Sequence, residues 1–260
     1  MMKVILIVVL TFLNSHLADA EEGAAGLMLC AEGKVSKVLA ADRFQLDSGE
    51  IVRLMMVKAP HMPQGSETGK PWPMAEQIEA FMRSRFTGEA FTFHCLERAR
   101  DRHGELVAMA KMADGGWLQS EMIKRGWAWV YSTGNFTYGA LALYGLEDEA
   151  RRQGHGLWTF TSYRLKDAAK LNNNVGRFEI VEGKVMGVAT VKNVTYINFG
   201  DDWRKDFTLK MDWRARKLFE KAGISVESLA GKRVQVRGWI SWYAGPMIEL
   251  THPAQIRLLD

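Results

Sequence analysis

The chain has 260 residues, a formal net charge of +4, 47% hydrophobic residues and 25% charged residues. That length suggests one large domain or two small ones, and the apolar content supports a sizeable core, which excludes a disordered or fibrous protein. The mild positive excess permits binding to a polyanion but does not require it.

Residues 1–20 have the features of an export signal. Lys3 precedes an apolar run from Val4 to Leu13, and Ala18-Asp19-Ala20 has the small-x-small pattern of a cleavage site. The apolar run is too short to cross a bilayer. We therefore expect a signal peptide cut after Ala20, and a periplasmic or secreted protein with no integral membrane span after cleavage.

The chain has two cysteines, Cys30 and Cys95, and both lie in its first half. In an oxidising compartment they can form a disulfide. As an alternative, both can be small buried apolar residues. The sequence leaves the choice open.

The first half shows strand and helix patterns. A strand-rich stretch from Gly33 to Val57 is broken at Asp47-Ser48-Gly49, which predicts a hairpin turn. A helix is expected to have Pro73 in its first turn and to end at Gly88. Further strands are expected at residues 91–95 and 106–112, and further helices at residues 117–125 and 138–153.

A change of composition around Asn172-Asn173-Asn174 suggests a linker, which we place at residues 161–176. Beyond it, residues 177–260 are strand-rich, with a helix expected at residues 214–222 before Gly223. The tetrapeptide Glu-Gly-Lys-Val opens both strand series, although a match this short arises easily by chance. The pattern favours two small barrels in tandem, the second of them OB-like.

Five motifs, in this order, carry a resemblance to a known family: Lys37–Asp42, Val52–Pro60, Asp101–Ala108, Gly126-Trp127-Ala128 and Glu149–Trp158. Because of them, residues 27–160 resemble the staphylococcal nuclease, or thermonuclease, family. The resemblance implies a five-stranded OB-type barrel carrying three helices, so the expected fold class is mainly β with helices (α+β). Residues 177–260 resemble the small additional domain of some bacterial exported thermonuclease-like proteins.

The resemblance also implies a reaction and a site. That family hydrolyses DNA and RNA phosphodiesters with calcium, which two aspartates hold and which polarises the phosphate and its attacking water. Two arginines stabilise the charge that builds on the phosphate in the transition state, and a glutamate orients or deprotonates the water.

This sequence matches that set only in part. Asp42 matches the first aspartate and Arg53 matches the first arginine. The departures are Lys58 for the second aspartate, Ala59 for the threonine after it, His61 for the glutamate and Glu105 for the second arginine. Exchanging a carboxylate for an ammonium removes oxygen ligands and reverses the local charge. We therefore expect no cofactor, with calcium bound only if other groups rebuild the site.

A rebuilt, metal-independent site is the alternative. In it, Lys58 would neutralise the phosphate in place of the ion, and the imidazole of His61 would act as general base. Arg102 or Arg100 would take the place of the second arginine.

These assignments make Asp42, Arg53 and His61 the catalytic candidates, with Lys58 and Arg102 as candidates for nucleic-acid binding. Each catalytic candidate also has a purely structural interpretation. Asp42 would then be a turn residue, Arg53 a surface residue on the barrel wall and His61 a solvated loop residue.

The second half offers a further set of nucleic-acid-binding candidates, Trp203, Arg204, Trp213 and Arg214. From Arg204 to Lys217 there are six Lys or Arg residues against two Asp. Cations beside aromatic rings are typical of single-strand binding, because the cations neutralise phosphates and the rings stack on bases. The alternatives are a hairpin tip with internally paired charges at residues 200–207, and a solvated helix face whose tryptophans lie in the core.

Three functions are compatible with these residues. The first is a thermonuclease-like protein that binds single-stranded nucleic acid, or another partner, with little or no cleavage. The second is an active nuclease with a rebuilt site. The third is a scaffold that binds another envelope protein. Salt dependence distinguishes them, because phosphate contacts weaken steeply with ionic strength and apolar protein interfaces do not.

Overall fold

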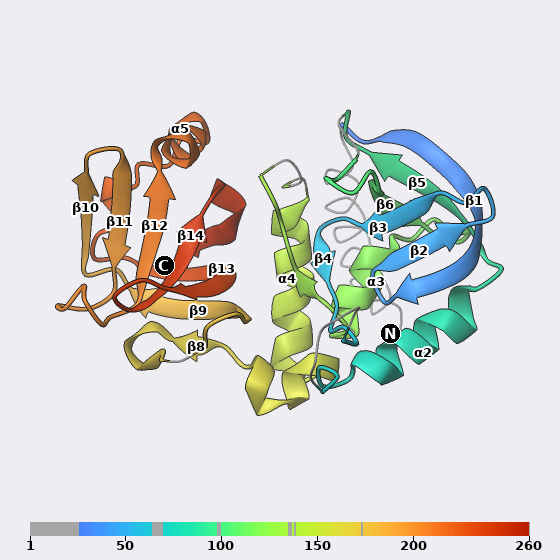
Figure 1. Ribbon diagram of the computed structural model, residues 1–260, viewed down its shortest axis with the longest axis horizontal. Helices are drawn as coiled ribbons and strands as arrows, with labels where there is room; N and C mark the ends of the chain where they lie inside the picture. The colour runs from blue at the N-terminus through green and yellow to red at the C-terminus, as the bar shows by residue number, and fades with distance from the viewer. Residues whose placement is uncertain are drawn as a thin grey trace, which may run out of the picture. The chain divides into compact units, whose positions relative to one another are not determined.

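The computed structural model of the chain describes residues 26–63, 70–97, 100–134, 137, 139–172 and 174–259. These divide into two compact units, one ending at Thr159 and the other beginning at Phe160 (Figure 1). The export signal expected at residues 1–20 lies outside the described residues. In the described part of the chain, no helix is both long enough and apolar enough to cross a membrane.

A closed barrel of five strands forms the first unit, with the strand order β1-β2-β3-β6-β5. The strands are β1 (Met28–Ala40), β2 (Arg43–Leu46), β3 (Ile51–Leu54), β5 (Ala90–Cys95) and β6 (Leu106–Lys111). β3 and β6 pair in parallel, whereas the other neighbours pair antiparallel. The predicted turn at Asp47-Ser48-Gly49 is confirmed, because Gly49 has a φ of 85° and its N–H donates to the Leu46 carbonyl.

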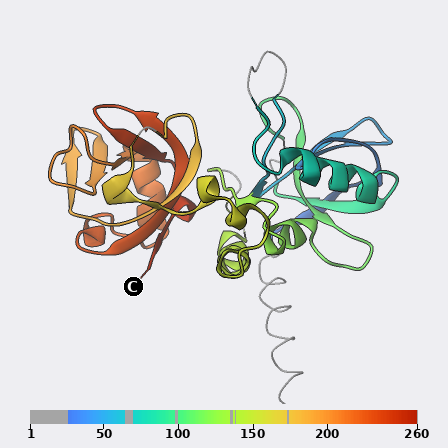
Figure 2. The same ribbon diagram turned by 90° about the horizontal axis from the view of Figure 1, so that it is seen from below.

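Three helices and a short strand pair surround the barrel. They are α2 (Ala75–Phe86), α3 (Leu118–Lys124), α4 (Ala140–Arg152), β4 (Val57–Lys58) and β7 (Trp129–Val130), followed by a 3-10 turn at Gly156–Thr159. α2 lies along the outside of the barrel against β1 (Figure 2). Its buried residues, Ile78 and Met82 among them, lie one helical turn apart and supply the apolar face that the sequence predicted.

Two of the family-like motifs meet in the first unit through glycine. Gly126 and Gly156 both have positive φ, and the Leu157 N–H donates to the Gly126 carbonyl at 2.8 Å. A Cβ atom on Gly126 would collide with the His155 carbonyl, and one on Gly156 would collide with the backbone of Arg125 and Gly126. Glycine is therefore required at both positions, because two turns touch there backbone to backbone.

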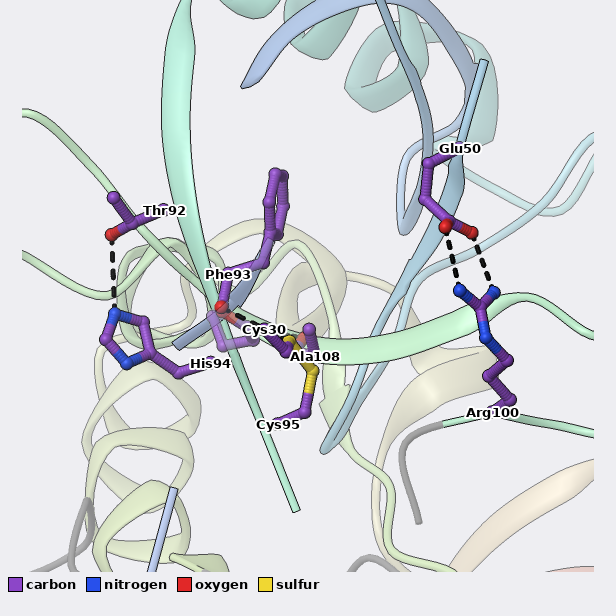
Figure 3. Close-up of a disulfide and its surroundings, with 9 residues drawn as sticks. Cys30, Glu50, Thr92, Phe93, His94, Cys95, Arg100 and Ala108 are labelled. Carbon is purple, nitrogen blue, oxygen red and sulfur yellow. Dashed lines mark hydrogen bonds and ion pairs between the residues drawn. A yellow bond between two sulfur atoms is a disulfide. The ribbon is translucent and has the colours of Figure 1, made fainter. Parts of the chain in front are cut away.

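A disulfide joins Cys30 near the start of β1 to Cys95 at the end of β5 (Figure 3). The bond links residues 65 positions apart in the sequence. Met28 lies opposite Cys95 in the antiparallel pair, so the disulfide fastens one end of the β1–β5 seam of the barrel. This settles the choice that the sequence left open.

The second unit is one curled sheet of eight strands, in the order β10-β11-β12-β14-β13-β9-β8, with β15 paired to β13 (Figure 1). The strands are β8 (Lys166–Asp167), β9 (Phe178–Lys184), β10 (Gly187–Val191), β11 (Val194–Asn198), β12 (Thr208–Asp212), β13 (Arg233–Trp242), β14 (Pro246–Leu250) and β15 (Ile256–Leu258). The predicted fold class, a barrel with helices followed by a second β domain, is confirmed.

One helix, α5 (Trp213–Lys221), follows β12 in this unit. Asp212 caps it by accepting a hydrogen bond from the Ala215 N–H at 2.8 Å, and Gly223, with a φ of 74°, follows its end as expected. Phe219 is fully buried in the core between α5 and the sheet. Short 3-10 turns complete the unit at Thr161–Tyr163, Ala168–Lys170, Glu227–Leu229 and Pro253–Gln255.

The stretch expected to be a linker, residues 161–176, differs from that expectation. β8 within it pairs in parallel with β9, and Ala168 and Leu171 belong to the buried core of the second unit. Gly183 allows this approach, since a Cβ atom there would lie 2.5 Å from the Ala168 side chain. The segment is therefore an integral part of the second unit.

A buried histidine makes the stability of the second unit depend on pH. His252 is 2% exposed, and burial lowers its pKa from 6.5 to about 4. Between these pH values the unfolded chain binds a proton on His252 that the folded chain does not bind. The stability that depends on a neutral His252 is therefore present above pH 6.5 and is lost as the pH falls toward 4. We expect a loss of about 2 kcal/mol between about pH 7 and about pH 4.5.

Urea titrations of the wild type and of His252→Gln at the two pH values measure that loss. The difference between the two proteins isolates His252 from the carboxylates, among them Glu179, whose pKa is raised by burial. Equal pH dependence in both proteins would contradict the assignment.

Candidate active site of the barrel

Asp42 lies in the turn between β1 and β2 and is held against a distant segment. Its main-chain carbonyl accepts from the Leu54 N–H at 2.9 Å, and its Oδ2 accepts from the Ala59 N–H at 3.4 Å. The carboxylate of Asp42 therefore lies beside the Lys58-Ala59 backbone. The structure thus brings together the first matched residue of the family pattern and the lysine that departs from it.

The path of the chain into Lys58 depends on an unusual backbone conformation at Met56. Met56 has a φ of 65°, in the left-handed region, and its side chain is buried. Its carbonyl accepts from the Tyr131 N–H at 2.9 Å, which aligns β4 with β7 so that Lys58 lies opposite Trp129. This turn between β3 and β4 directs Lys58 toward the Asp42 turn.

A buried glutamate binds two arginines at the centre of the site. The register of β2 and β3 puts Arg43 opposite Arg53, and the side chain of Glu105 enters from the start of β6. Glu105 is 6% exposed, and its carboxylate accepts from Arg43 Nη2 and, at 2.9 Å, from Arg53 Nη2. Arg53 also lies 3.4 Å, from Nε to Oδ2, from Asp101. The guanidinium of Arg53 is therefore shared between two carboxylates.

The turn before β6 positions Glu105. Asp101 Oδ1 accepts from the N–H groups of His103 at 2.8 Å and Glu105 at 3.1 Å, and Gly104 takes a φ of 78°. Arg102 in this turn is exposed, and its Nε lies 3.0 Å from His103 Nε2. Arg102 is thus close in sequence to the cluster but does not contact Glu105 through any interaction seen in the described residues.

Arg100, the other candidate for the second arginine, is engaged elsewhere. Its two Nη atoms bind the two carboxylate oxygens of Glu50 at 2.9 and 2.8 Å (Figure 3). The hydrogen bond from Arg100 lowers the pKa of the Glu50 carboxyl below its usual value. Arg100 also donates to the Gly104 carbonyl at 2.7 Å, which ties it to the turn before β6.

An open groove of about 640 Å³ lies over this cluster. It is lined by Arg43, Gly49, Glu50, Ile51, Arg53, His103, Gly104 and Glu105. Two guanidinium groups and two carboxylates line it, so its formal charge is close to neutral when His103 is neutral. A phosphate entering the groove would have to compete with Glu105 for both arginines.

His61 lies apart from this groove, in an aromatic cluster. Its ring centroid is 4.3 Å from that of Trp72, which in turn is 6.0 Å from that of Trp129. Trp129 is the residue paired with Lys58. His61 is therefore neither wholly solvated nor among the described residues that line the groove.

The candidates of the second unit do not form one element. Trp203 lies in the turn between β11 and β12, and Trp213 begins α5 directly after β12, so the five-residue strand separates them by roughly 16 Å. Both side chains are exposed, Trp203 at 54% and Trp213 at 45%, so neither lies in the core. Arg204 lies over the ring of Trp203 at 4.6 Å, and Arg214 over that of Trp213 at 5.3 Å.

The turn around Trp203 has internally paired charges, as one alternative proposed. Lys205 lies 3.5 Å from Asp202, whose N–H donates to Asp206 at 2.7 Å. The sequence suggested one basic and aromatic element here, and the structure differs from that expectation. There is a nearly neutral hairpin tip at Trp203 and a separate cationic group at Trp213.

Sequence reasoning missed Arg43 and Asp101, both of which contact the central residues. Arg43 follows Asp42 directly, but its place on the strand next to Arg53 becomes a signal only once the β2–β3 register is known. Among the described residues, no group of three or more His, Cys, Asp or Glu side chains is arranged to hold a metal ion.

Comparison with known proteins agrees with this fold. A family model described as "Staphylococcal nuclease homologue" matches residues 51–160. A protein of Escherichia coli O157:H7 named "Uncharacterized endonuclease" is 31% identical over 135 residues, which cover 51% of this chain and 81% of that protein, and an Escherichia coli protein of the same name matches equally. "Probable endonuclease LCL3" of Schizophyllum commune is 29% identical over 109 residues, 37% of each chain.

Proposed function

This chain belongs to the staphylococcal nuclease family, and from that premise we propose that it binds single-stranded nucleic acid on its barrel with little or no hydrolysis. One observation carries the proposal. Glu105, in place of the family's second arginine, is buried and binds both Arg43 and Arg53. A carboxylate at that position repels the charge that builds on a phosphate in the transition state, where an arginine would stabilise it.

The donor set around Asp42 does not fit calcium. That ion takes six to eight oxygen ligands, usually including several carboxylates. Beside the Asp42 carboxylate lies the N–H of Ala59, which is not an oxygen ligand, and the residue before it is Lys58 where the family has its second aspartate. The buried carboxylate of Glu105 is already bound by two guanidinium groups. The proposal therefore assigns no step to a metal.

Binding without cleavage requires cations that remain accessible beside the groove. Arg53 retains 39% of its side-chain exposure and Arg43 retains 27%. Arg102 is exposed in the turn that contributes His103 and Gly104 to the groove. These cations support backbone contacts, which determine affinity without requiring any bond to break.

An active nuclease with a rebuilt site is the second candidate, and the printed names of the relatives, which are endonucleases, favour it. In that case His61 would have to reach the groove from its place against Trp72. Arg53 would also have to exchange Glu105 for the phosphate. A scaffold for an envelope protein remains the third candidate, and weak salt dependence of its binding would identify it.

Export to the periplasm or the medium is part of the proposal. The signal pattern at residues 1–20 supports it, and so does the disulfide between Cys30 and Cys95, since disulfides persist in oxidising compartments.

The test combines cleavage with binding. We expect no turnover of single-stranded DNA or RNA with calcium, magnesium or chelator, and oligonucleotide binding that weakens with salt. Glu105→Gln should raise the affinity for the oligonucleotide about tenfold, because Arg43 and Arg53 are released. The slope of affinity against salt concentration should steepen by the amount expected for about one to two additional phosphate contacts. Fluorescence anisotropy at several salt concentrations measures both quantities.

Glu50→Gln is the matched control, because it removes a second groove carboxylate but leaves the Glu105 pair intact. Calcium-dependent turnover that disappears in Asp42→Ala and Arg53→Ala would refute the proposal. Turnover that survives chelator but not Arg53→Ala would instead establish the rebuilt site.

A further inference from the structure

The outward face of α5 is cationic. Ala215 and Phe219 point into the core, at 5% and 0% exposure. The opposite side of the helix therefore faces solvent. It carries Trp213, Lys217 and Lys221 at intervals of four residues, with Arg214 beside them, and all four are exposed. We call these four residues the α5 face.

The charge on the α5 face is not compensated. Within the described part of the chain, Arg214, Lys217 and Lys221 form no ion pair with a carboxylate. The nearby Glu220 and Glu227 both bind Arg216, at 3.2 and 2.7 Å, on the side of the helix that turns toward β10 and β11. Three positive charges therefore face solvent together.

The aromatic member of the α5 face is held in place by its neighbours. The guanidinium of Arg214 lies 5.3 Å from the centre of the Trp213 ring, and the ammonium of Lys217 lies 4.8 Å from it. The ring is nevertheless 45% exposed. Two cations thus orient an indole that still presents ring surface to solvent, so a flat ligand can stack on it without displacing core residues.

We infer that the α5 face is a second binding site for single-stranded nucleic acid, which rests on the proposed function of the chain. Residues four apart on a helix rise about 6 Å, so Trp213, Lys217 and Lys221 form a line about 12 Å long that follows a strand of phosphates. Trp213 stacks on a base, and an exposed base face is available in a single strand but not inside a duplex.

The chemistry of the face favours nucleic acid over a lipid surface. A helix that lies in a membrane interface inserts an apolar face, but the apolar face of α5 is occupied by the core of the unit. What remains outward is three cations and one indole, with Leu218 at the margin at 42% exposure. Figure 1 shows α5 following β12, with one side packed toward the sheet and the other side away from it.

The experiment uses the full chain and a fluorescent single-stranded deoxythymidine oligonucleotide. The triple variant Arg214→Gln/Lys217→Gln/Lys221→Gln should bind at least about tenfold more weakly, with a salt slope lower by about 2, because three phosphate contacts are lost. Trp213→Ala should weaken binding by about fivefold to a hundredfold with little change in slope, because a stacking contact carries no phosphate charge.

The matched control is Lys184→Gln/Lys232→Gln/Arg233→Gln, which removes the same charge from exposed positions on β9, on β13 and immediately before it. An α5 triple variant that binds like this control overturns the inference and leaves the barrel proposal standing. Loss of binding that is confined to barrel variants such as Arg53→Gln also overturns the inference and leaves the barrel proposal standing. Absence of binding by the wild type overturns both proposals.

Anionic phospholipid vesicles provide the competing arm. Vesicle binding that requires the α5 face, together with oligonucleotide binding that does not, overturns the inference in favour of a lipid surface. Circular dichroism of each variant shows whether α5 and its unit remain folded.

Discussion

Substituting the family's residues at four positions, together with one compensating change, is expected to produce calcium-dependent cleavage of single-stranded DNA that the wild type lacks. The changes are Lys58→Asp, Ala59→Thr, His61→Glu, Glu105→Arg and Arg43→Gln. Lys58→Asp places a second carboxylate beside Asp42, whose side chain already reaches the Ala59 N–H. Two carboxylates together provide up to about four of the oxygen ligands that calcium requires, and water can supply the others.

The other substitutions supply and protect the phosphate clamp. Glu105→Arg places a guanidinium beside Arg53, and a positioned donor of this kind accelerates a reaction by about a hundredfold or more. Arg43→Gln is needed because Arg43 would otherwise lose the carboxylate that it binds and face two guanidinium groups. His61→Glu supplies a carboxylate in the segment that follows Lys58.

Calorimetric titration with calcium and a single-turnover cleavage assay measure the outcome. The matched control carries Lys58→Asn with the other four changes, because asparagine has the size of aspartate without its charge. We expect the control to bind calcium poorly and to cleave at least about a hundredfold more slowly than the full variant. Equal calcium binding by the wild type would show that the ion uses other ligands, and our account of Lys58 would then be wrong.

The sequence predicted those elements whose signals are local. Gly49, Gly88 and Gly223 all adopt positive φ where a turn or helix end was expected, because glycine takes that conformation without steric cost. The start of α5 is also local, since Asp212 caps it through its own side chain.

Features that depend on distant partners were not predictable in the same way. The stretch around Leu171 is polar and rich in asparagine, which is typical of a linker, yet Ala168 and Leu171 enter the second core. Their burial depends on space left at Gly183, a residue in another strand. The composition of the segment around Leu171 does not reveal the space beside Gly183, because Gly183 belongs to a different part of the sequence.

The site shows the same division. The motifs placed Asp42, Arg53 and Lys58, but the role of Arg43 depends on the pairing of β2 with β3. Trp203 and Trp213 appeared to belong to one interleaved segment because they are ten positions apart in the sequence. An extended strand, β12, lies between them, so they serve separate surfaces.

Removing the disulfide is expected to be the largest single loss of stability in the first unit. The bond between Cys30 and Cys95 closes a loop with a sequence separation of 65, and the entropy of such a loop corresponds to about 4 kcal/mol at 25 °C. For a unit of this size, that loss lowers the midpoint of thermal unfolding by roughly 15 °C. The variant Cys30→Ala/Cys95→Ala, followed by calorimetry, measures the shift.

The control lies within the same molecule, because both cysteines belong to the first unit and the second has none. The transition of the second unit should therefore stay in place, and a reductant should lower the first transition in the wild type but not in the variant. Equal midpoints for wild type and variant would mean that the β1–β5 pairing alone holds the seam. If the expected shift is found, the barrel loses about 4 kcal/mol in a reducing compartment, and that loss favours the exported location over the cytoplasm.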